Sequence, residues 1–425
     1  MKETKSLINT AEIKEKVILI GVDIKQSPVL AKDSVQELEE LAKTAGADTV
    51  ATVIQSLDNI HSAHYIGKGK IEEVKNLIAE HNATGVICDD ELSPVQLRNL
   101  EQLLDSKVMD RTMLILDIFA QRATSREGKL QVELAQQQYR LPRLVGLGTS
   151  LSRLGGGIGT RGPGEQKLET DRRHIRAHIQ ELKKELKDLE SHRSLIRNRR
   201  QNTGTPLVGI IGYTNAGKST LLNTLTEAGV LAEDKLFATL DPTTRKVELP
   251  GGTEILISDT VGFIHKLPHH LIQAFRSTLE EVQYADVLLH VVNSQSINLS
   301  HQMEIVYETL QQIGSIQCPI ITVYNKTDLP SPQPLPIDPK ASKTFYISAK
   351  ENQGLEELLQ GIEEILQENK EILEVLIPYN ESQWVQFIYG QCEVITTEHC
   401  AEGTYIKAYA DMSVCKRMEK YKVEE

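Results

Sequence analysis

The first 110 residues alternate between short apolar runs and amphipathic stretches. Short apolar runs are typical of buried strands, and apolar residues that recur every three to four positions are typical of helices. Strands are expected at residues 17–22, 49–54, 85–88 and 107–109. Helices are expected at residues 34–45 and 71–81, with a third starting at Ser93 and Pro94, which suit the N-cap and first helical positions. This alternation predicts a small parallel α/β domain at residues 1–111.

Helix formers dominate residues 112–141, which predicts a single helix there. A later predicted helix carries an apolar seam with the spacing of a coiled coil. The seam consists of Ile175, Ile179, Leu182, Leu186, Leu189 and Ile196. Because so narrow a seam needs a partner, we expect a helical hairpin over residues 112–204. Residues 154–164 are too rich in glycine for a regular element, so we expect a mobile loop at or near the tip.

The rest of the chain predicts two further domains. Apolar runs at residues 206–211, 255–258, 319–324 and 344–347 predict the strands of a mostly parallel sheet, in an α/β domain at residues 205–370. Strand-like residues 375–378 and 404–409 and helix-like residues 413–421 predict a small α+β domain at residues 371–425. The residues of this last domain do not indicate its role.

Composition limits the setting of the protein. Hydrophobic residues make up 40% and charged residues 25% of 425, and no apolar run approaches the length of a membrane span. The amino terminus lacks the apolar core of a signal peptide, so we expect a cytoplasmic protein. The five cysteines are Cys88, Cys318, Cys392, Cys400 and Cys415. They form no zinc-type pairs, so reduced thiols are expected, with a disulfide or metal cluster among the last three as the alternative.

Charge is segregated along the chain. The net charge is -12, which by itself argues against a nucleic-acid partner. Residues 122–200 nevertheless hold 18 Lys and Arg against nine Asp and Glu, a local charge of +9 that leaves -21 for the rest. The predicted hairpin is therefore the basic part of an acidic protein.

A phosphate-binding loop follows the apolar run at 206–211 and precedes a helical stretch. It consists of Gly212, Tyr213, Thr214, Asn215, Ala216, Gly217, Lys218 and Ser219. Glycines let successive backbone N–H groups point at a phosphate, and the helix N-terminus adds partial positive charge. We expect Lys218 to stabilise charge on the β- and γ-phosphates and Ser219 to bind Mg²⁺.

A second motif selects the base. Asn325, Lys326, Thr327 and Asp328 follow the apolar run at 319–324. A carboxylate at Asp328 accepts from guanine N1–H and from the exocyclic amine, whereas adenine offers no donor at N1. Binding a base that leaves this carboxylate unpaired costs several kcal/mol. The motif therefore predicts GTP rather than ATP as the substrate. Ser348, Ala349 and Lys350 follow another predicted strand, and their backbone N–H groups suit guanine O6.

Two further motifs lie where γ-phosphate sensors are expected. Asp259, Thr260, Val261 and Gly262 end the predicted strand 255–258. Asp259 would hold Mg²⁺ through water, and the Gly262 N–H would sense the γ-phosphate. The first sensor segment contains Phe237, Ala238, Thr239, Leu240 and Asp241. Thr239 would complete the Mg²⁺ shell when triphosphate is bound, with Thr243 and Thr244 as competitors for this role.

The five motifs follow each other in the order of a P-loop GTPase, each after a predicted strand, where ligands of open α/β sheets bind. The chain resembles the HflX family of translational GTPases over nearly its whole length. The resemblance rests on residues 212–219, the run Phe-Ala-Thr-Leu-Asp-Pro-Thr at 237–243 and the glycine-rich residues 152–167. It implies binding to the large ribosomal subunit near the peptidyl-transferase centre, splitting of stalled ribosomes, a role in heat stress and, in some members, peripheral membrane association. We expect a monomer.

A basic hairpin with a flexible tip suits rRNA grooves, and Arg153, Arg161 and Lys167 are the candidate RNA contacts. The alternative is a solvated charged coiled coil. Phe263 follows Gly262 where better-known GTPases carry a water-orienting glutamine, so slow intrinsic hydrolysis and activation by the ribosome are expected. No residue is assigned as catalytic beyond the roles of Lys218 and Gly262 toward the phosphates. A further hypothesis is that Asn215 coordinates K⁺ in place of an arginine finger.

Two other functions stay open. A large-subunit assembly GTPase would bind immature particles, and an RNA-remodelling ATPase would need a base site that Asp328 opposes. A nucleotide-gated membrane adaptor is less well supported, since no lipid anchor or basic amphipathic amino-terminal segment is present.

Overall fold

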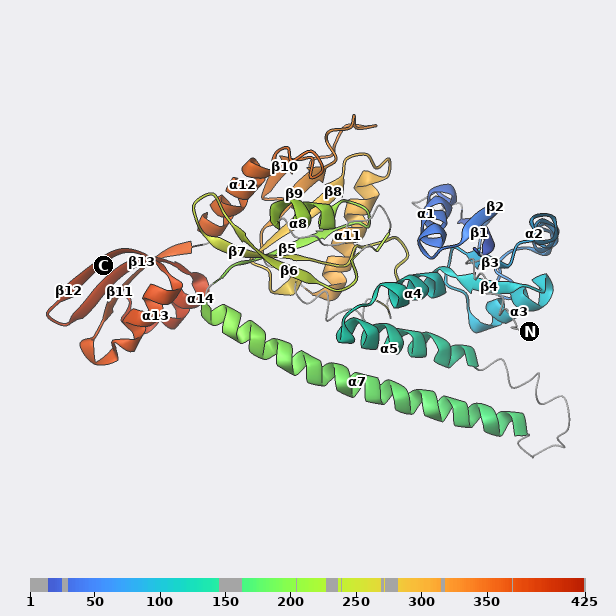
Figure 1. The fold of residues 1–425 in the computed structure, drawn as a ribbon, viewed down its shortest axis with the longest axis horizontal. Coiled ribbons are helices and arrows are strands. Elements are labelled where there is room, and N and C mark those ends of the chain that lie inside the picture. Colours follow the sequence, from blue (N-terminus) through green and yellow to red (C-terminus); the bar gives the residue numbers. More distant parts are fainter. Residues whose placement is uncertain are drawn as a thin grey trace, which may run out of the picture. The chain divides into compact units, whose positions relative to one another are not determined.

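The computed structural model describes residues 14–24, 30–144, 163–203, 205–226, 236–237, 239–268, 271, 282–314, 318–368 and 370–423 (Figure 1). The chain forms two compact units. The first holds residues 1–184, 235–237 and 265–274, and the second holds residues 185–234, 238–264 and 275–425. Within the described residues, no helix is long and apolar enough to cross a membrane.

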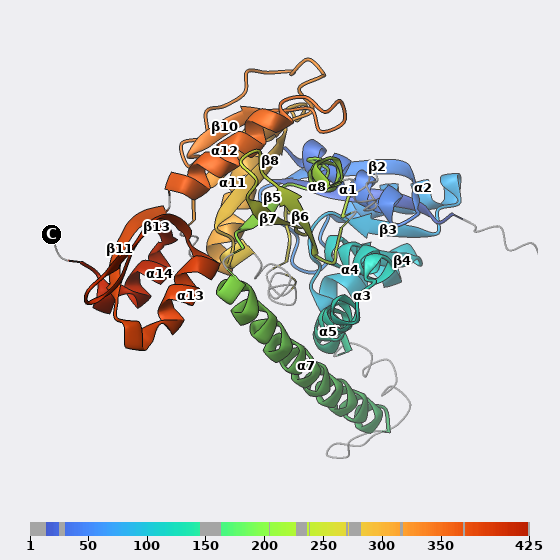
Figure 2. The same ribbon diagram turned by 60° about the vertical axis from the view of Figure 1, so that its left-hand side comes forward.

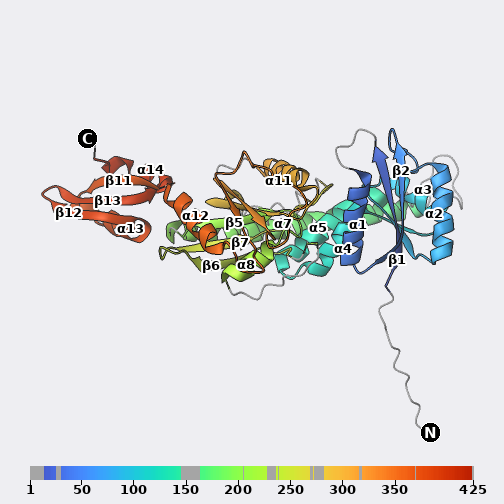
Figure 3. The ribbon, with the colours of Figure 1, turned by 90° about the horizontal axis from the view of Figure 1, so that it is seen from above.

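The first unit contains the predicted parallel α/β domain. Its strands are β1 (Lys16–Ile24), β2 (Asp48–Leu57), β3 (Gly85–Cys88) and β4 (Lys107–Asp110), all parallel in the order β2-β1-β3-β4. Its helices are α1 (Ala31–Thr44), α2 (Lys68–His81) and α3 (Pro94–Leu104). Figure 3 shows α1 on one face of the sheet and α2 and α3 on the other. The predicted start of α3 is confirmed, because Ser93 and Gln96 form a reciprocal capping box.

A buried ionic cluster lies at the carboxyl ends of β3 and β4. The guanidinium of Arg111 is 1% exposed, lies 2.7 Å from Asp89 Oδ1 and also pairs with Glu37. Asp89 accepts a second hydrogen bond from Ser34 Oγ at 2.7 Å. Removing one partner from a buried ion pair is strongly destabilising, so these groups hold one another in place.

The predicted single helix over residues 112–141 is wrong, because two helices, α4 (Arg111–Arg122) and α5 (Arg126–Arg143), occupy the segment. Ser125 is the N-cap of α5, and its side chain accepts a hydrogen bond from the Gly128 N–H at 2.8 Å. This cap starts a new helix after α4 ends. A side chain that caps the next helix competes with continuation of the previous one.

The second arm of the predicted hairpin is α7 (Pro163–Thr203), a helix of 41 residues. It begins inside the glycine-rich stretch, so the prediction that residues 154–164 lack regular structure is wrong for its last two residues. Pro163 suits a first helical position because its missing N–H has no partner there. In the first unit α7 contacts α5, since His178 Nε2 lies 2.8 Å from Glu133 Oε1. The expected loop before residue 163 lies outside the described residues.

The second unit contains a six-stranded sheet in the order β10-β9-β8-β5-β7-β6, parallel except for β6. The strands are β5 (Leu207–Gly212), β6 (Thr243–Glu248), β7 (Glu254–Asp259), β8 (Val287–Asn293), β9 (Ile320–Asn325) and β10 (Lys343–Tyr346). Apolar residues of α8 (Lys218–Thr226) and α12 (Leu355–Glu368) form one core with this sheet. Residues of α11 (Leu299–Ile313) pack with β8 and β9 in a separate cluster. The predicted mostly parallel sheet is confirmed.

The carboxy-terminal residues form an antiparallel sheet in the order β11-β13-β12. Its strands are β11 (Lys370–Ile377), β12 (Glu393–Cys400) and β13 (Gly403–Asp411), and its helices are α13 (Gln383–Gln391) and α14 (Met412–Arg417). Figure 2 shows both helices beside this sheet, and Ile388 and Val414 carry them into a shared core. The described residues include all five cysteines and contain no disulfide.

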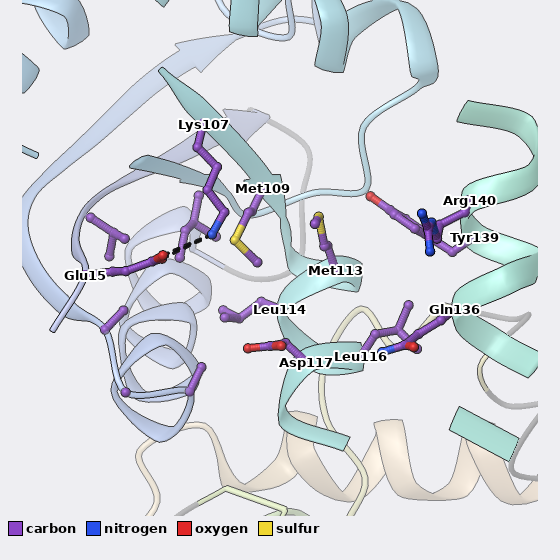
Figure 4. A pocket seen from close by; sticks show the side chains of 15 residues that line it. Glu15, Lys107, Met109, Met113, Leu114, Leu116, Asp117, Gln136, Tyr139 and Arg140 are labelled. Carbon is purple, nitrogen blue, oxygen red and sulfur yellow. Dashed lines mark hydrogen bonds and ion pairs between the residues drawn. The ribbon is translucent and has the colours of Figure 1, made fainter. Parts of the chain in front are cut away.

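A pocket of about 690 Å³ opens in the first unit, away from the ionic cluster. Figure 4 shows side chains of α4 and α5 lining it, among them Met113 and Arg140, next to the ion pair of Lys107 with Glu15. Lys107 begins β4 and Glu15 precedes β1, so this pocket lies at the amino ends of the strands. Ligands of parallel α/β sheets bind at the other edge, so the pocket is not placed like a nucleotide site.

We predict that the contact between α5 and α7 depends on pH. The hydrogen bond to Glu133 raises the pKa of His178 above its ordinary value. A raised pKa means that the ion pair contributes fully below the unfolded-state value of about 6.5 and is lost as pH rises through the folded-state value. NMR titration of His178 should give a raised pKa that falls in Glu133→Gln.

The matched control is Glu181→Gln, which removes the weaker partner of His178 at 3.5 Å and should lower this pKa less. An unchanged titration in Glu133→Gln would show that the two helices do not meet through this pair.

Candidate GTP-binding site

The loop between β5 and α8 requires glycine at two positions. Gly212 has φ +149°, and a Cβ there would lie 2.2 Å from the Val291 carbonyl oxygen. Gly217 has φ +92°, and a Cβ there would lie 2.3 Å from Asn325 Nδ2. The backbone therefore turns tightly against β8 and β9 and leads into the N-terminus of α8, where N–H groups are free to bind phosphate.

Lys218 lies folded against this loop. Its Nζ donates to the carbonyl oxygens of Tyr213 at 2.8 Å and Gly212 at 3.2 Å. Burial lowers the pKa of Lys218 to about 8, and the nearby Asp259 carboxylate opposes that shift. A phosphate beside this amine would favour its charged form. Asn215 adopts a left-handed conformation with φ +58° in the same loop, and its role toward K⁺ stays a prediction.

Three oxygen-bearing side chains meet at the start of α8. Ser219 Oγ lies 2.6 Å from Thr239 Oγ1 and 2.7 Å from Asp259 Oδ2. Asp259 is fully buried, burial raises its pKa, and its Oδ1 has no hydrogen-bond partner. A buried carboxylate oxygen without a partner needs a cation or water, and hydroxyl and carboxylate oxygens are ligands that Mg²⁺ prefers. The three residues therefore fit the predicted Mg²⁺ site.

Thr239 is the threonine that the structure brings to Ser219. The two competitors lie on β6, where Thr243 pairs with Asp259 and Thr244 with Ser258 in the ladder, and Thr244 Oγ1 donates to Ser258 Oγ at 3.2 Å. Strand pairing therefore fixes Thr243 beside Asp259 and Thr244 beside Ser258, while the hydroxyl within hydrogen-bond distance of Ser219 Oγ is that of Thr239.

The segment after β7 runs along the phosphate loop. The Thr214 N–H donates to the Phe263 carbonyl at 2.8 Å, and the Phe263 N–H donates to the Gly212 carbonyl at 3.2 Å. A Cβ on Gly262 would lie 2.8 Å from Thr214 Cγ2 and 3.0 Å from Thr214 Cα, so glycine lets the backbone pass this close to the phosphate loop, beside Lys218. The Phe263 side chain is 1% exposed, and a buried aromatic ring cannot orient an attacking water. Val261 is also buried, and Thr260 Oγ1 donates to the Ile210 carbonyl at 2.7 Å.

Asn325 joins three loops. Its Nδ2 donates to the Ala216 carbonyl at 3.0 Å, and its Oδ1 accepts from the N–H groups of Lys326 at 2.8 Å and Ala349 at 3.0 Å. The buried amide therefore ties the phosphate loop to both segments predicted to contact guanine.

The residues predicted to contact guanine differ in their exposure. Asp328 and Lys350 are exposed, whereas Ser348 and Ala349 are buried. Thr327 Oγ1 donates to the Ile347 carbonyl at 2.9 Å, which brings the two guanine segments together. The Asp328 carboxylate is therefore accessible to a ligand.

The first sensor segment divides between the two units. Phe237 has φ +55°, and its ring packs edge-on against Phe119 at 4.7 Å between centroids. Leu240 is buried and Asp241 is half-buried, and Ala238 lies outside the described residues. The Phe237 side chain therefore packs in the first unit, two residues before Thr239 in the second.

Two contributors to the site had no signal in the sequence. Thr224 Oγ1, on α8, donates to the Ala349 carbonyl at 2.9 Å and so braces the guanine segment. His290, on β8, is buried near Lys218, and burial lowers its pKa to about 4, so the imidazole is neutral at pH 7. A threonine in a helix and a histidine in an apolar strand are usual core residues, which is why neither stands out. Of the candidate RNA contacts, Arg153 and Arg161 lie outside the described residues, and Lys167 lies in α7.

Comparison with known proteins gives three family matches along the chain. Residues 32–120 match the family described as GTP-binding GTPase N-terminal, and residues 122–200 match GTP-binding GTPase Middle Region. Residues 207–326 match the family described as 50S ribosome-binding GTPase.

Two curated relatives carry the name GTPase HflX. The protein of Lacrimispora saccharolytica is 56% identical over 95% of both chains, and that of Caldanaerobacter subterraneus is 50% identical over 97% of this chain and 94% of its own. Among solved structures, a GTP-binding protein of Sulfolobus solfataricus in complex with GDP aligns with 24% identity and a TM-score of 0.44, covering 83% of this chain and 99% of that chain.

We predict that Asp328→Asn exchanges the base preference. An amide in place of the carboxylate loses an acceptor for the guanine N1–H and amine pair and gains a donor for the C2 carbonyl of xanthine. Affinity for GDP should fall by about 100-fold or more, and affinity for XDP should rise. Competition with a fluorescent nucleotide measures both constants.

Lys350→Ala is the control, because that segment is expected to act through backbone N–H groups and its side chain is exposed. If Asp328→Asn kept the guanine preference of the parent protein, the assignment of Asp328 would be wrong.

Proposed function

This chain belongs to the HflX family of GTPases and hydrolyses GTP, and we propose that it binds the large ribosomal subunit and dissociates stalled or idle 70S ribosomes. In this proposal GTP binding is the switch, and hydrolysis allows release. Support comes from the match of residues 207–326 to a ribosome-binding GTPase family and from the name that the relatives carry. The observation that carries the proposal is the basic helical arm in an otherwise acidic protein.

The switch rests on the residues around the phosphate loop. Lys218 and the N–H groups of α8 would bind the phosphates, and Gly262 would sense the γ-phosphate. Mg²⁺ held by Ser219 and Thr239, and by Asp259 through water, would neutralise phosphate charge. Thr239 and Gly262 lie on the two sensor segments, so their positions would depend on whether a γ-phosphate is present.

Slow hydrolysis without a partner follows from Phe263. Its ring is buried, and its backbone is hydrogen-bonded to the phosphate loop. The residue at the position that would orient water therefore fixes this segment against the phosphate loop. We infer that the ribosome supplies or orders the missing element.

The basic arm favours an RNA partner. On α7 the apolar residues Ile179 and Leu182 are buried, while Arg173, Arg176 and Lys183 are exposed. Cations on an outer face release counterions when they meet phosphates, which drives binding to rRNA. A solvated coiled coil that binds nothing is the alternative, and it would show no dependence on ribosomes.

The first test mixes the purified protein with mature 70S ribosomes and separates the particles on a sucrose gradient. With GTP or a non-hydrolysable analogue we expect 30S and 50S peaks at the expense of 70S. With GDP the 70S peak should stay, because neither sensor segment has a γ-phosphate to bind. Lys218→Ala is the matched control that should leave 70S intact under every nucleotide.

The same gradient separates the alternatives. An assembly GTPase would leave mature 70S particles intact and sediment with immature large subunits. An RNA-remodelling ATPase would use ATP as well as GTP, which the exposed carboxylate of Asp328 opposes. Intact 70S peaks with every nucleotide would overturn the splitting proposal.

We also predict that added 50S subunits raise GTP hydrolysis and that salt reduces the effect. Arg153→Glu, Arg161→Glu and Lys167→Glu together should abolish most of the stimulation and flatten its salt dependence, because they remove phosphate contacts. Intrinsic hydrolysis without subunits should be unchanged in this variant. Equal hydrolysis rates with and without 50S, or full stimulation in the charge-reversed variant, would contradict the electrostatic role.

A further inference from the structure

Both γ-phosphate sensor segments have an anchor in the first compact unit. Residues 235–237 and 265–274 belong to that unit, whereas Thr239 and Gly262 belong to the unit that holds the phosphate loop. Each segment therefore passes from one unit to the other within a few residues of its γ-phosphate sensor. Such short connections transmit a displacement at one end to the other.

The second segment is anchored by an ammonium group between two carboxylates. Lys266 Nζ lies 2.5 Å from Asp89 Oδ2 and 2.6 Å from Asp90 Oδ1. The lysine side chain is 29% exposed, Asp89 is 1% exposed and Asp90 is 21% exposed. Lys266 also has φ +54°, a conformation that costs a non-glycine residue energy and persists when contacts hold it.

The acceptor pair is built by the N-terminal domain. Asp89 is held by Arg111 and Ser34, and Asp90 Oδ2 accepts from the Tyr65 hydroxyl at 2.6 Å. Burial raises the pKa of Asp89, but the charges of Arg111 and Lys266 lower it more, so the pKa lies below its ordinary value. Both carboxylates are thus fixed by groups other than the lysine. The pair forms a preset site for one cation.

The first segment has an apolar anchor. Phe237 is 2% exposed, and it packs against Phe119, which is 1% exposed and lies on α4. With both anchors in place, Thr239 Oγ1 lies 2.6 Å from Ser219 Oγ, and the Gly262 backbone lies against Lys218. These are the positions in which each sensor would meet Mg²⁺ or the γ-phosphate.

We propose that Lys266 is a positioning residue, whose ion pairs with Asp89 and Asp90 hold Gly262 in the arrangement that binds triphosphate better than diphosphate. Phe119 does the same for Thr239 through Phe237. The N-terminal α/β domain then contributes to nucleotide selection without contacting the nucleotide. This role concerns the free protein and is measured without ribosomes. A negative result would therefore refute this role without bearing on the splitting activity.

The test compares the affinities of the full chain for a non-hydrolysable GTP analogue and for GDP. In Lys266→Ala the ratio of the two affinities should shift toward GDP by about fivefold or more, the range of ordinary coupling between sites. Intrinsic GTP hydrolysis should fall in parallel. Asp90→Asn keeps an acceptor for Tyr65 but removes the charge, and it should shift the ratio in the same direction.

Lys266→Ala combined with Asp90→Asn should shift the ratio no further than the larger single change, because the two residues act through one ion pair. Lys70→Ala is the matched control, since its side chain is 28% exposed and its ion pair with Glu73 also lies in the first unit. It should leave the ratio unchanged.

A purely structural role predicts a different result. If Lys266→Ala lowered thermal stability while the two nucleotide affinities changed by the same factor, the positioning role would be refuted. Additive shifts in the double variant would equally refute a shared ion pair as the cause. Phe119→Leu, which leaves every charge in place, should shift the ratio in the same direction, and an unchanged ratio would remove Phe119 from the proposal.

Discussion

The side-chain amide of Asn325 bonds three loops together at one edge of the central sheet. It meets the phosphate loop at Ala216 and the two guanine segments at Lys326 and Ala349. Because Gly217 is packed against the same amide, the phosphate loop and the base site share one reference point. One ligand can then contact these loops with both its phosphates and its base only while the hydrogen bonds of Asn325 hold them in these relative positions. Removing the amide would leave buried backbone groups without partners, which is costly.

Lys218 and Asp259, next to the phosphate loop, are both buried ionisable groups. Burial favours the neutral forms of both Lys218 and Asp259, while each partly stabilises the charge of the other. A phosphate would stabilise the charged form of Lys218, and a divalent cation would stabilise that of Asp259. The residues that would respond to them lie on segments that continue into the other unit, at Phe237 and Lys266. The two sensor segments are thus covalently continuous with residues that pack in the first unit.

Local chemistry explains most of what the sequence predicted of the fold. The period of apolar residues predicted β1 to β4 and the strands β5, β7, β9 and β10, but it missed β6 and the central strand β8. Ser93 and Pro94 marked the start of α3. The same reasoning failed at Ser125, where the apolar pattern continues through a helix break. It also missed β12 and α13, since edge strands and short helices carry weak periodicity.

The sequence by itself determined the family, the reaction and the order of the GTP motifs, because each motif depends on residues adjacent in the chain. The sequence favoured Thr239 but left Thr243 and Thr244 as competitors, and only the tertiary structure brought Thr239 to Ser219 and placed the other two on β6. Only the tertiary structure revealed that Asp89 and Lys266, 177 positions apart, form an ion pair. Contacts between distant residues leave no local pattern, because they arise from how whole elements pack.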